Sequence, residues 1–159
     1  MKIFRSLVLP LLLYGSETWA LLRSDIRKLE SFQMRCLRRI LGVSLRDRLK
    51  NGVIRQRCCR QTTVEMEIQQ RRLRWFGHVC RMQPERYPHK TLWRIRPHDW
   101  KIQRGAPKKT WLKQISKGLS NCRLSIQQAK IVAMDRLQWR RTVKTLRTPV
   151  VSTAALNAS

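Results

Sequence analysis

Apolar side chains recur every three or four residues between residues 25 and 41, which is the spacing of one face of an α-helix. Ser24 is a residue type that caps helix N-termini, and Gly42 is typical of a helix C-terminal end. We therefore expect an amphipathic helix over residues 25–41. Its buried face would carry Ile26, Leu29, Phe32, Cys36, Leu37, Ile40 and Leu41. Its outer face would carry Arg27, Lys28, Arg35, Arg38 and Arg39.

Similar patterns predict four further helices, over residues 51–60, 63–82, 107–117 and 125–146. Two of them begin at a capping-box sequence, Thr62-x-x-Glu65 and Ser125-x-x-Gln128. Gly118 is expected to end the helix over residues 107–117. No strand pair is evident, so we predict an all-α fold in which about five amphipathic helices form a loose bundle.

Residues 84–107 lack a helical period and contain four of the six prolines together with Trp93 and Trp100. They are expected to form a Pro/Trp-rich connecting loop, with one helical turn after Pro88. Residues 149–159 carry neither charge nor period, and they are expected to be a disordered tail.

The excess of positive charge adds a prediction about the partner of this helical chain. The chain of 159 residues has 35 Lys and Arg against 9 Asp and Glu, a net charge of +26 and a pI of about 11.6. The excess is spread over the chain, since residues 21–60 hold 12 basic side chains, residues 61–120 hold 14 and residues 121–159 hold 7. Such a chain repels itself, and a polyanion is the simplest partner. RNA or DNA is the leading candidate, ahead of an anionic membrane surface.

The cysteines and the N-terminus indicate an intracellular protein, either nuclear or cytoplasmic. Five cysteines without regular spacing argue against the disulfide framework of a secreted protein. Residues 2–13 are nearly all apolar and superficially resemble a secretory signal, but Pro10 interrupts them and no small-x-small cleavage site follows. A stretch of this kind needs neighbours to cover it on several sides.

Catalytic chemistry is not expected. Polymerases hold two divalent ions between clustered carboxylates, and the only aspartates are dispersed along the chain: Asp25, Asp47, Asp99 and Asp135. His78 and Cys80, with Cys58 and Cys59 upstream, invite a zinc interpretation. A structural zinc site needs paired ligands two to four residues apart on both sides, and neither pair fits that pattern. We therefore predict no enzyme activity, no cofactor, no metal site and no small-molecule substrate.

The basic clusters on the predicted helices are the main candidates for contacts to phosphates. They are Arg35, Arg38, Arg39, Arg71, Arg72, Arg74 and Arg140. A solvated helix face is the alternative, but few carboxylates lie nearby in the sequence to pair with them.

The connecting loop supplies the remaining candidates. Gly105 permits close backbone approach to a phosphate, and Pro107 favours a helix N-terminus there. The basic residues of this region are Arg94, Arg96, Arg104, Lys108 and Lys109, which would also suit a nuclear import signal. Trp93 and Trp100 are candidates for stacking on unpaired bases, whereas Trp75 and Trp139 are expected in the core.

Five strings, in this order and at these distances, resemble the C-terminal part of the endonuclease and reverse transcriptase polyproteins of non-LTR (LINE-type) retrotransposons. They are LLLYGSETW (residues 11–19), MRCLRRILG (34–42), RRLRWFGHVCRM (71–82), RGAPKKTW (104–111) and AMDRLQWR (133–140). The resemblance covers about residues 3–147. It implies a thumb-like helical segment over residues 1–60 and a basic post-thumb segment over residues 61–148.

The resemblance also implies a role in holding template RNA and target DNA, beside an upstream polymerase core that would be a partner. The chain departs from the family pattern at Ala106, where a second Arg is usual, and at Asn51-Gly52, where an acidic helix start is common. These departures are typical of a decaying, truncated copy. Three alternatives stay open: a functionless translated remnant, a basic host protein that packs RNA, and a cationic membrane-surface protein.

Overall fold

The computed structural model describes residues 1–94, 101, 104–105 and 110–146. Within these residues every regular element is helical, which confirms the all-α prediction. The elements in chain order are η1 (Phe4–Val8), α1 (Leu9–Leu12), α2 (Arg23–Leu41), α3 (Asn51–Arg57), α4 (Val64–Cys80), α5 (Tyr87–Trp93), α6 (Trp111–Asn121), α7 (Ile126–Met134) and α8 (Arg136–Thr145). The predicted count of about five helices is too low for the described part of the chain.

The extra helices have local causes. The segment predicted as one helix over residues 125–146 is two, because Asp135 adopts an extended conformation and caps α8. Its carboxylate accepts hydrogen bonds from the backbone N–H groups of Leu137 at 2.8 Å and Gln138 at 3.1 Å. The predicted turn after Pro88 is the seven-residue helix α5, and the apolar N-terminal segment forms η1 and α1. The predicted disordered tail lies outside the described residues.

The start of α2 differs by a few residues from the prediction. Ser24 is not the N-cap, since α2 begins at Arg23. The N-cap is Leu22, and the carboxylate of Asp25 accepts its backbone N–H at 3.0 Å. Gly42 ends the helix as predicted, with φ of +66°, a conformation that favours glycine.

The predicted cap of α4 is wrong by one residue, whereas that of α7 is confirmed. The cap of α4 is Thr63, whose hydroxyl accepts the Met66 N–H at 3.2 Å, one residue after the predicted Thr62. The Ser125 and Gln128 capping box of α7 is confirmed, with both reciprocal hydrogen bonds present.

Gly118 does not end a helix but lies inside α6. A Cβ at this position would lie 2.9 Å from the Gln69 side chain of α4. The glycine therefore lets two helices approach closely, and the predicted stop at this residue was wrong for that reason.

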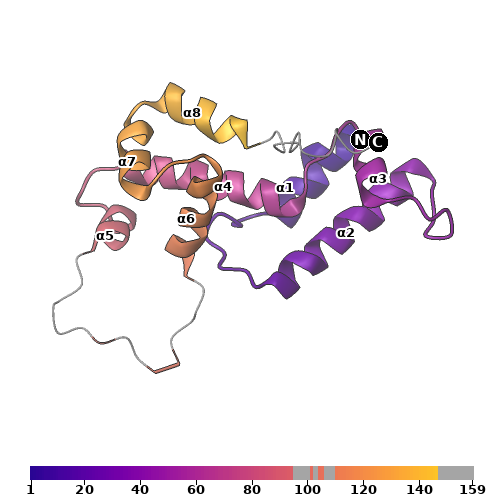
Figure 1. The fold of residues 1–159 in the computed structure, drawn as a ribbon, viewed down its shortest axis with the longest axis horizontal. Helices are drawn as coiled ribbons and strands as arrows, with labels where there is room; N and C mark the ends of the chain where they lie inside the picture. The colour runs from indigo at the N-terminus through magenta and orange to yellow at the C-terminus, as the bar shows by residue number, and fades with distance from the viewer. Residues whose placement is uncertain (95–100, 102–103, 106–109, 147–159) are drawn as a thin grey trace, which may run out of the picture.

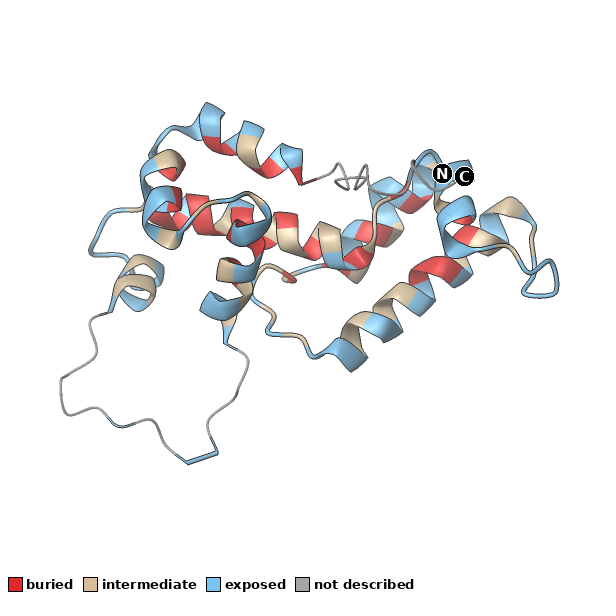
Figure 2. Ribbon diagram, viewed as in Figure 1, coloured by how far each residue is buried: buried red, intermediate tan, exposed pale blue. Residues whose placement is uncertain are grey.

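Helix α4 runs through the middle of the molecule and contacts α2, α5, α6, α7 and α8 (Figure 1). Buried residues follow it along its length (Figure 2). Its first half belongs to a cluster with α1, α2 and α3 that includes Leu13, Leu37 and Ile54. Its second half belongs to a cluster with α6, α7 and α8 that includes Ile115 and Trp139. A division of the chain after residue 60 stays a prediction.

Trp139 fixes α8 against α4. Its side chain is 2% exposed, and its indole Nε1 donates to the backbone carbonyl of Leu73 at 3.0 Å. A Cβ on Gly77 would lie only 2.1 Å from that nitrogen, so the absence of a side chain at residue 77 makes room for the indole.

Within the described residues, no helix combines the length and the hydropathy needed to cross a bilayer.

Gly77→Ala should destabilise the fold. The new Cβ must displace Trp139 from α4, and overpacking of this kind costs about 1 to 3 kcal/mol. Helix propensity favours alanine by about 1 kcal/mol and offsets only part of that loss. Urea unfolding followed by circular dichroism should show a lower midpoint with an unchanged slope.

Gly52→Ala is the matched control, because a Cβ there meets nothing within 4 Å. This change in α3 should leave the free energy of unfolding unchanged or raise it by up to about 1 kcal/mol. Equal unfolding midpoints for the two variants would show that Trp139 does not need the space at Gly77.

Asp135→Ala should also lower stability, since it removes the side-chain acceptor from the N-terminus of α8. Loss of an N-cap costs typically about 1 kcal/mol. Asp135→Asn keeps an acceptor oxygen and should recover most of the thermal midpoint. If the alanine and asparagine variants melt together, the cap contributes nothing measurable.

Candidate nucleic-acid interface

A basic groove of about 720 Å³ lies between α4 and α8. We call it the α4–α8 groove. It is lined by Arg74, His78, Arg81, Arg136, Trp139, Arg140, Val143 and Lys144. Four of these side chains are arginines and one is a lysine, and none is acidic.

Helical periodicity places these residues on facing sides of the two helices. On α4 the positions 74, 78 and 81 are spaced by four and three residues, and on α8 the positions 136, 140 and 144 are spaced by four. Residues at such spacings share one face of a helix. Trp139 and Val143 are nearly buried, and they hold the two basic faces opposite one another.

The cations of the groove have no carboxylate partners in the described part of the chain. The ion pairs found there are Arg55 with Glu30 and Lys117 with Glu65, both outside the groove. Arg81 is half-buried and donates to the carbonyl of Ala133, which ties α4 to the end of α7. Arg74, Arg136, Arg140 and Lys144 are exposed, so an anion in the groove would meet unneutralised charge.

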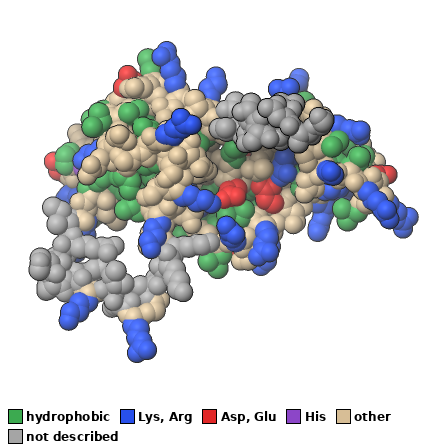
Figure 3. Space-filling view, viewed as in Figure 1, with side chains coloured by type: hydrophobic (Ala, Val, Ile, Leu, Met, Phe, Trp, Pro, Cys, Tyr) green, Lys and Arg blue, Asp and Glu red, His purple; other side chains and the backbone are tan. Residues whose placement is uncertain are grey.

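Figure 3 shows that basic side chains are spread over the visible face of the molecule rather than gathered at one end. Of the predicted phosphate contacts on α2, Arg35 and Arg39 are exposed. Arg38 is half-buried and donates to the carbonyl of Leu49 at 3.2 Å and to Oδ1 of Asn51 at 2.8 Å, so it joins α2 to the start of α3.

Two of the three candidate arginines on α4 are structural. Arg71 donates to the carbonyl of Leu13 at 3.0 Å and anchors the N-terminal segment. Arg72 is 5% exposed, and its guanidinium donates to the carbonyl of Trp19 at 2.6 Å and to Gln114 at 3.3 Å. Burial lowers the pKa of Arg72. Because Arg72 does not reach the surface, we leave it out of the interface.

The loop candidates are only partly described. Arg94 and Arg104 are exposed, whereas Arg96, Trp100, Lys108 and Lys109 lie outside the described residues. Trp93 is engaged with its neighbours: Lys130 Nζ lies 4.3 Å from the centre of its ring, and Phe76 meets it edge-on at 6.3 Å.

Trp139 is in the core, as the sequence predicted. Trp75 is half-buried, with one part of its ring open to a second cavity.

Sequence reasoning found Arg74 and Arg140 but missed Arg81, Arg136 and Lys144 as members of one site. Arg136 and Lys144 are each four residues from Arg140, and Arg81 is seven residues from Arg74. These spacings indicate a shared helix face. Nothing in the sequence indicates that the two faces meet across 66 residues. His78 is exposed in the groove, and its ring lies 5.3 Å from that of Trp75.

His78 and Cys80 do not face a common point. His78 is exposed, whereas Cys80 is buried in the cluster around Trp139. Burial raises the pKa of the Cys80 thiol to about 11, which disfavours the thiolate that a metal needs. Among the described residues, no group of three or more His, Cys, Asp or Glu is placed to hold a metal ion.

Comparison with known proteins gives a distant relative. The chain is 27% identical over 150 residues to an uncharacterized transposon-derived protein of Caenorhabditis elegans. The aligned region covers 90% of this chain and 53% of that relative, so the chain spans about half of the relative's length. Neither a protein-family model nor a solved structure matches the chain. The similarity supports a transposon origin for this chain.

Proposed function

We propose that the α4–α8 groove binds the sugar-phosphate backbone of RNA or DNA, and that it does so with little regard to sequence. The convergence of four exposed cations from two helices, without a carboxylate partner in the described residues, carries this proposal. Contacts to phosphates carry no sequence information, because every nucleotide presents the same phosphate. Release of counterions from the nucleic acid would supply most of the affinity.

The geometry of α8 suits a linear polyanion. Arg136, Arg140 and Lys144 are spaced by four residues, which is about 6 Å along a helix axis at 1.5 Å per residue. Arg74 and Arg81 face them from α4. A strand lying in the groove would therefore pass between two rows of cations.

We further propose that the chain derives from the thumb and post-thumb part of a LINE-type reverse transcriptase. The transposon-derived relative supports the general origin, and the five sequence strings support the finer assignment. In this role the chain would hold nucleic acid inside a cell, in the nucleus or the cytoplasm, while the chemistry belonged to other parts of the parent polyprotein.

An upstream polymerase core is the proposed protein partner. The N-terminal segment presents an apolar stripe to solvent, in which Ile3 is 70% exposed, Leu7 65%, Leu11 80% and Tyr14 83%. An exposed apolar stripe of this kind is typical of a protein–protein interface. The core that precedes the thumb in this family would cover it.

Neutralising the groove should weaken binding and reduce its dependence on salt. In the triple variant Arg74→Gln, Arg140→Gln and Lys144→Gln, each lost phosphate contact should lower the slope of log K against log salt by about one unit. Fluorescence anisotropy of a labelled RNA strand and a labelled DNA duplex, at about 50 and 200 mM salt, measures this slope.

The matched control carries the same change of charge outside the groove, as Arg46→Gln, Arg57→Gln and Arg141→Gln. These residues are exposed, and Arg141 is the neighbour of Arg140 on α8. If the two triple variants lost equal affinity, only the net charge would matter, and binding in the α4–α8 groove would be refuted. A folded wild-type chain that binds no nucleic acid at low salt would favour the functionless remnant.

A further inference from the structure

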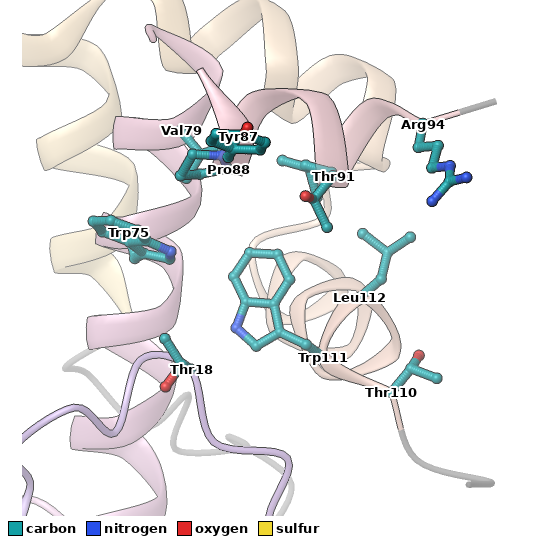
Figure 4. A pocket seen from close by; sticks show the side chains of 11 residues that line it. Thr18, Trp75, Val79, Tyr87, Pro88, Thr91, Arg94, Thr110, Trp111 and Leu112 are labelled. Atoms are coloured by element: carbon teal, nitrogen blue, oxygen red, sulfur yellow. The ribbon is translucent and has the colours of Figure 1, made fainter. Parts of the chain in front are cut away.

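A second cavity, of about 800 Å³, lies between α4, α5 and α6 and is lined by aromatic rings. We call it the aromatic pocket. Trp75 enters it from α4, Tyr87 and Pro88 from α5, and Trp111 from α6 (Figure 4). Its volume falls within the range of roughly 300 to 1,000 Å³ that is usual for ligand sites.

The two tryptophan rings are held in position but not fully covered. Trp111 is half-buried, and its indole Nε1 donates to the backbone carbonyl of Glu17 at 2.6 Å, which fixes the orientation of the ring. Trp75 is half-buried and lies against His78, with the ring centres 5.3 Å apart. Stacking surfaces that are already ordered lose little conformational entropy when a flat ligand binds.

The rim of the aromatic pocket is polar and basic. Thr18, Thr91 and Thr110 contribute hydroxyl groups, and Arg94 lies at the outer edge (Figure 4). None of the lining residues is acidic. The pocket therefore suits a flat aromatic group that is attached to an anion, which is the chemistry of a nucleotide.

The aromatic pocket and the α4–α8 groove lie on neighbouring faces of one helix. Arg74 lines the groove and Trp75 lines the pocket, although they are consecutive residues. The contact between His78 of the groove and Trp75 of the pocket joins the two sites directly. The two sites therefore adjoin one another along α4.

We propose that the aromatic pocket binds an unpaired nucleobase of the strand whose phosphates occupy the groove. This inference rests on the proposed function and deepens it, because a base within a duplex is stacked and paired and does not offer its face to a protein ring. The chain should therefore prefer single strands, ends and gaps over continuous duplex.

Removing the bases from the ligand provides the sharpest test. Wild-type chain is titrated by fluorescence anisotropy with labelled oligothymidylate and with an abasic strand of the same length and the same number of phosphates. The abasic strand should bind about tenfold more weakly, which corresponds to about 1.4 kcal/mol. Equal affinities for the two strands would overturn the proposal that the aromatic pocket binds a base. They would leave the proposed phosphate binding in the groove untouched.

Variants locate the effect in the pocket. Trp75→Leu and Trp111→Leu keep apolar bulk but remove the stacking face, and each should weaken oligothymidylate binding about tenfold while changing duplex binding by less than about twofold. Trp111→Phe should recover part of the loss, because phenylalanine keeps a ring face. Trp93→Leu is the control, since that ring is already in contact with Lys130 and Phe76.

The remaining outcomes also decide the question. If the leucine variants remain folded by circular dichroism and lose duplex and single-strand binding equally, the pocket is not specific for a base. Displacement of oligothymidylate by a proline-rich peptide would identify the pocket as a peptide site and overturn the inference. If a leucine variant unfolds, the abasic comparison on the wild-type chain decides. Absence of salt-dependent binding to every ligand, duplex included, would overturn the proposed function and this inference together.

Discussion

The seating of Trp139 on Gly77 is the contact on which the candidate site depends. A helix normally keeps its carbonyls out of reach of a neighbouring helix, because Cβ atoms surround the backbone. At residue 77 there is no Cβ, so the indole of Trp139 reaches the carbonyl of Leu73 at 3.0 Å. This contact, together with the burial of Val143 in the same cluster, packs α8 against α4 with positions 136, 140 and 144 lining one groove with positions 74, 78 and 81.

Arginine serves two different purposes in this chain. Arg71 and Arg72 use their guanidinium groups to bind backbone carbonyls of the N-terminal segment, and Arg38 does the same for the turn before α3. A long side chain with several donors can satisfy carbonyls that no helix partner reaches. Burial of Arg72 carries a desolvation cost, which its hydrogen bonds to Trp19 and Gln114 offset in part. The net charge therefore overstates the number of cations that are free to meet an anion.

Local chemistry explains how much of the fold could be predicted from the sequence. Helix α2, the capping box of α7 and the Gly42 end of α2 follow from residues within a few positions of one another, and the prediction placed them closely. The break at Asp135 was missed because the apolar period continues across it, although an aspartate is a good cap. Gly118 was misread because a glycine that ends a helix and one that admits a neighbouring side chain look the same in sequence. The two kinds of glycine differ only in how distant segments pack against them, and the sequence alone does not show that packing.

In the candidate site, too, the sequence predicts local features but not the contacts between distant segments. Charge and helical spacing identified Arg74 and Arg140, but their meeting in one groove depends on Trp139, and no local pattern reveals that. The tryptophans were assigned by their surroundings in sequence: those in a Pro-rich loop were expected to be open, and those on helices were expected to be buried. The structure shows Trp93 engaged by Lys130 and Phe76. Trp75 is open on one side, because it lies on the side of α4 that faces the aromatic pocket and belongs to neither core cluster. Helix α4 thus contributes its buried face to the core, Arg74 and His78 to the groove, and Trp75 to the aromatic pocket. The proposed phosphate site and the proposed base site lie on two neighbouring sides of the same helix.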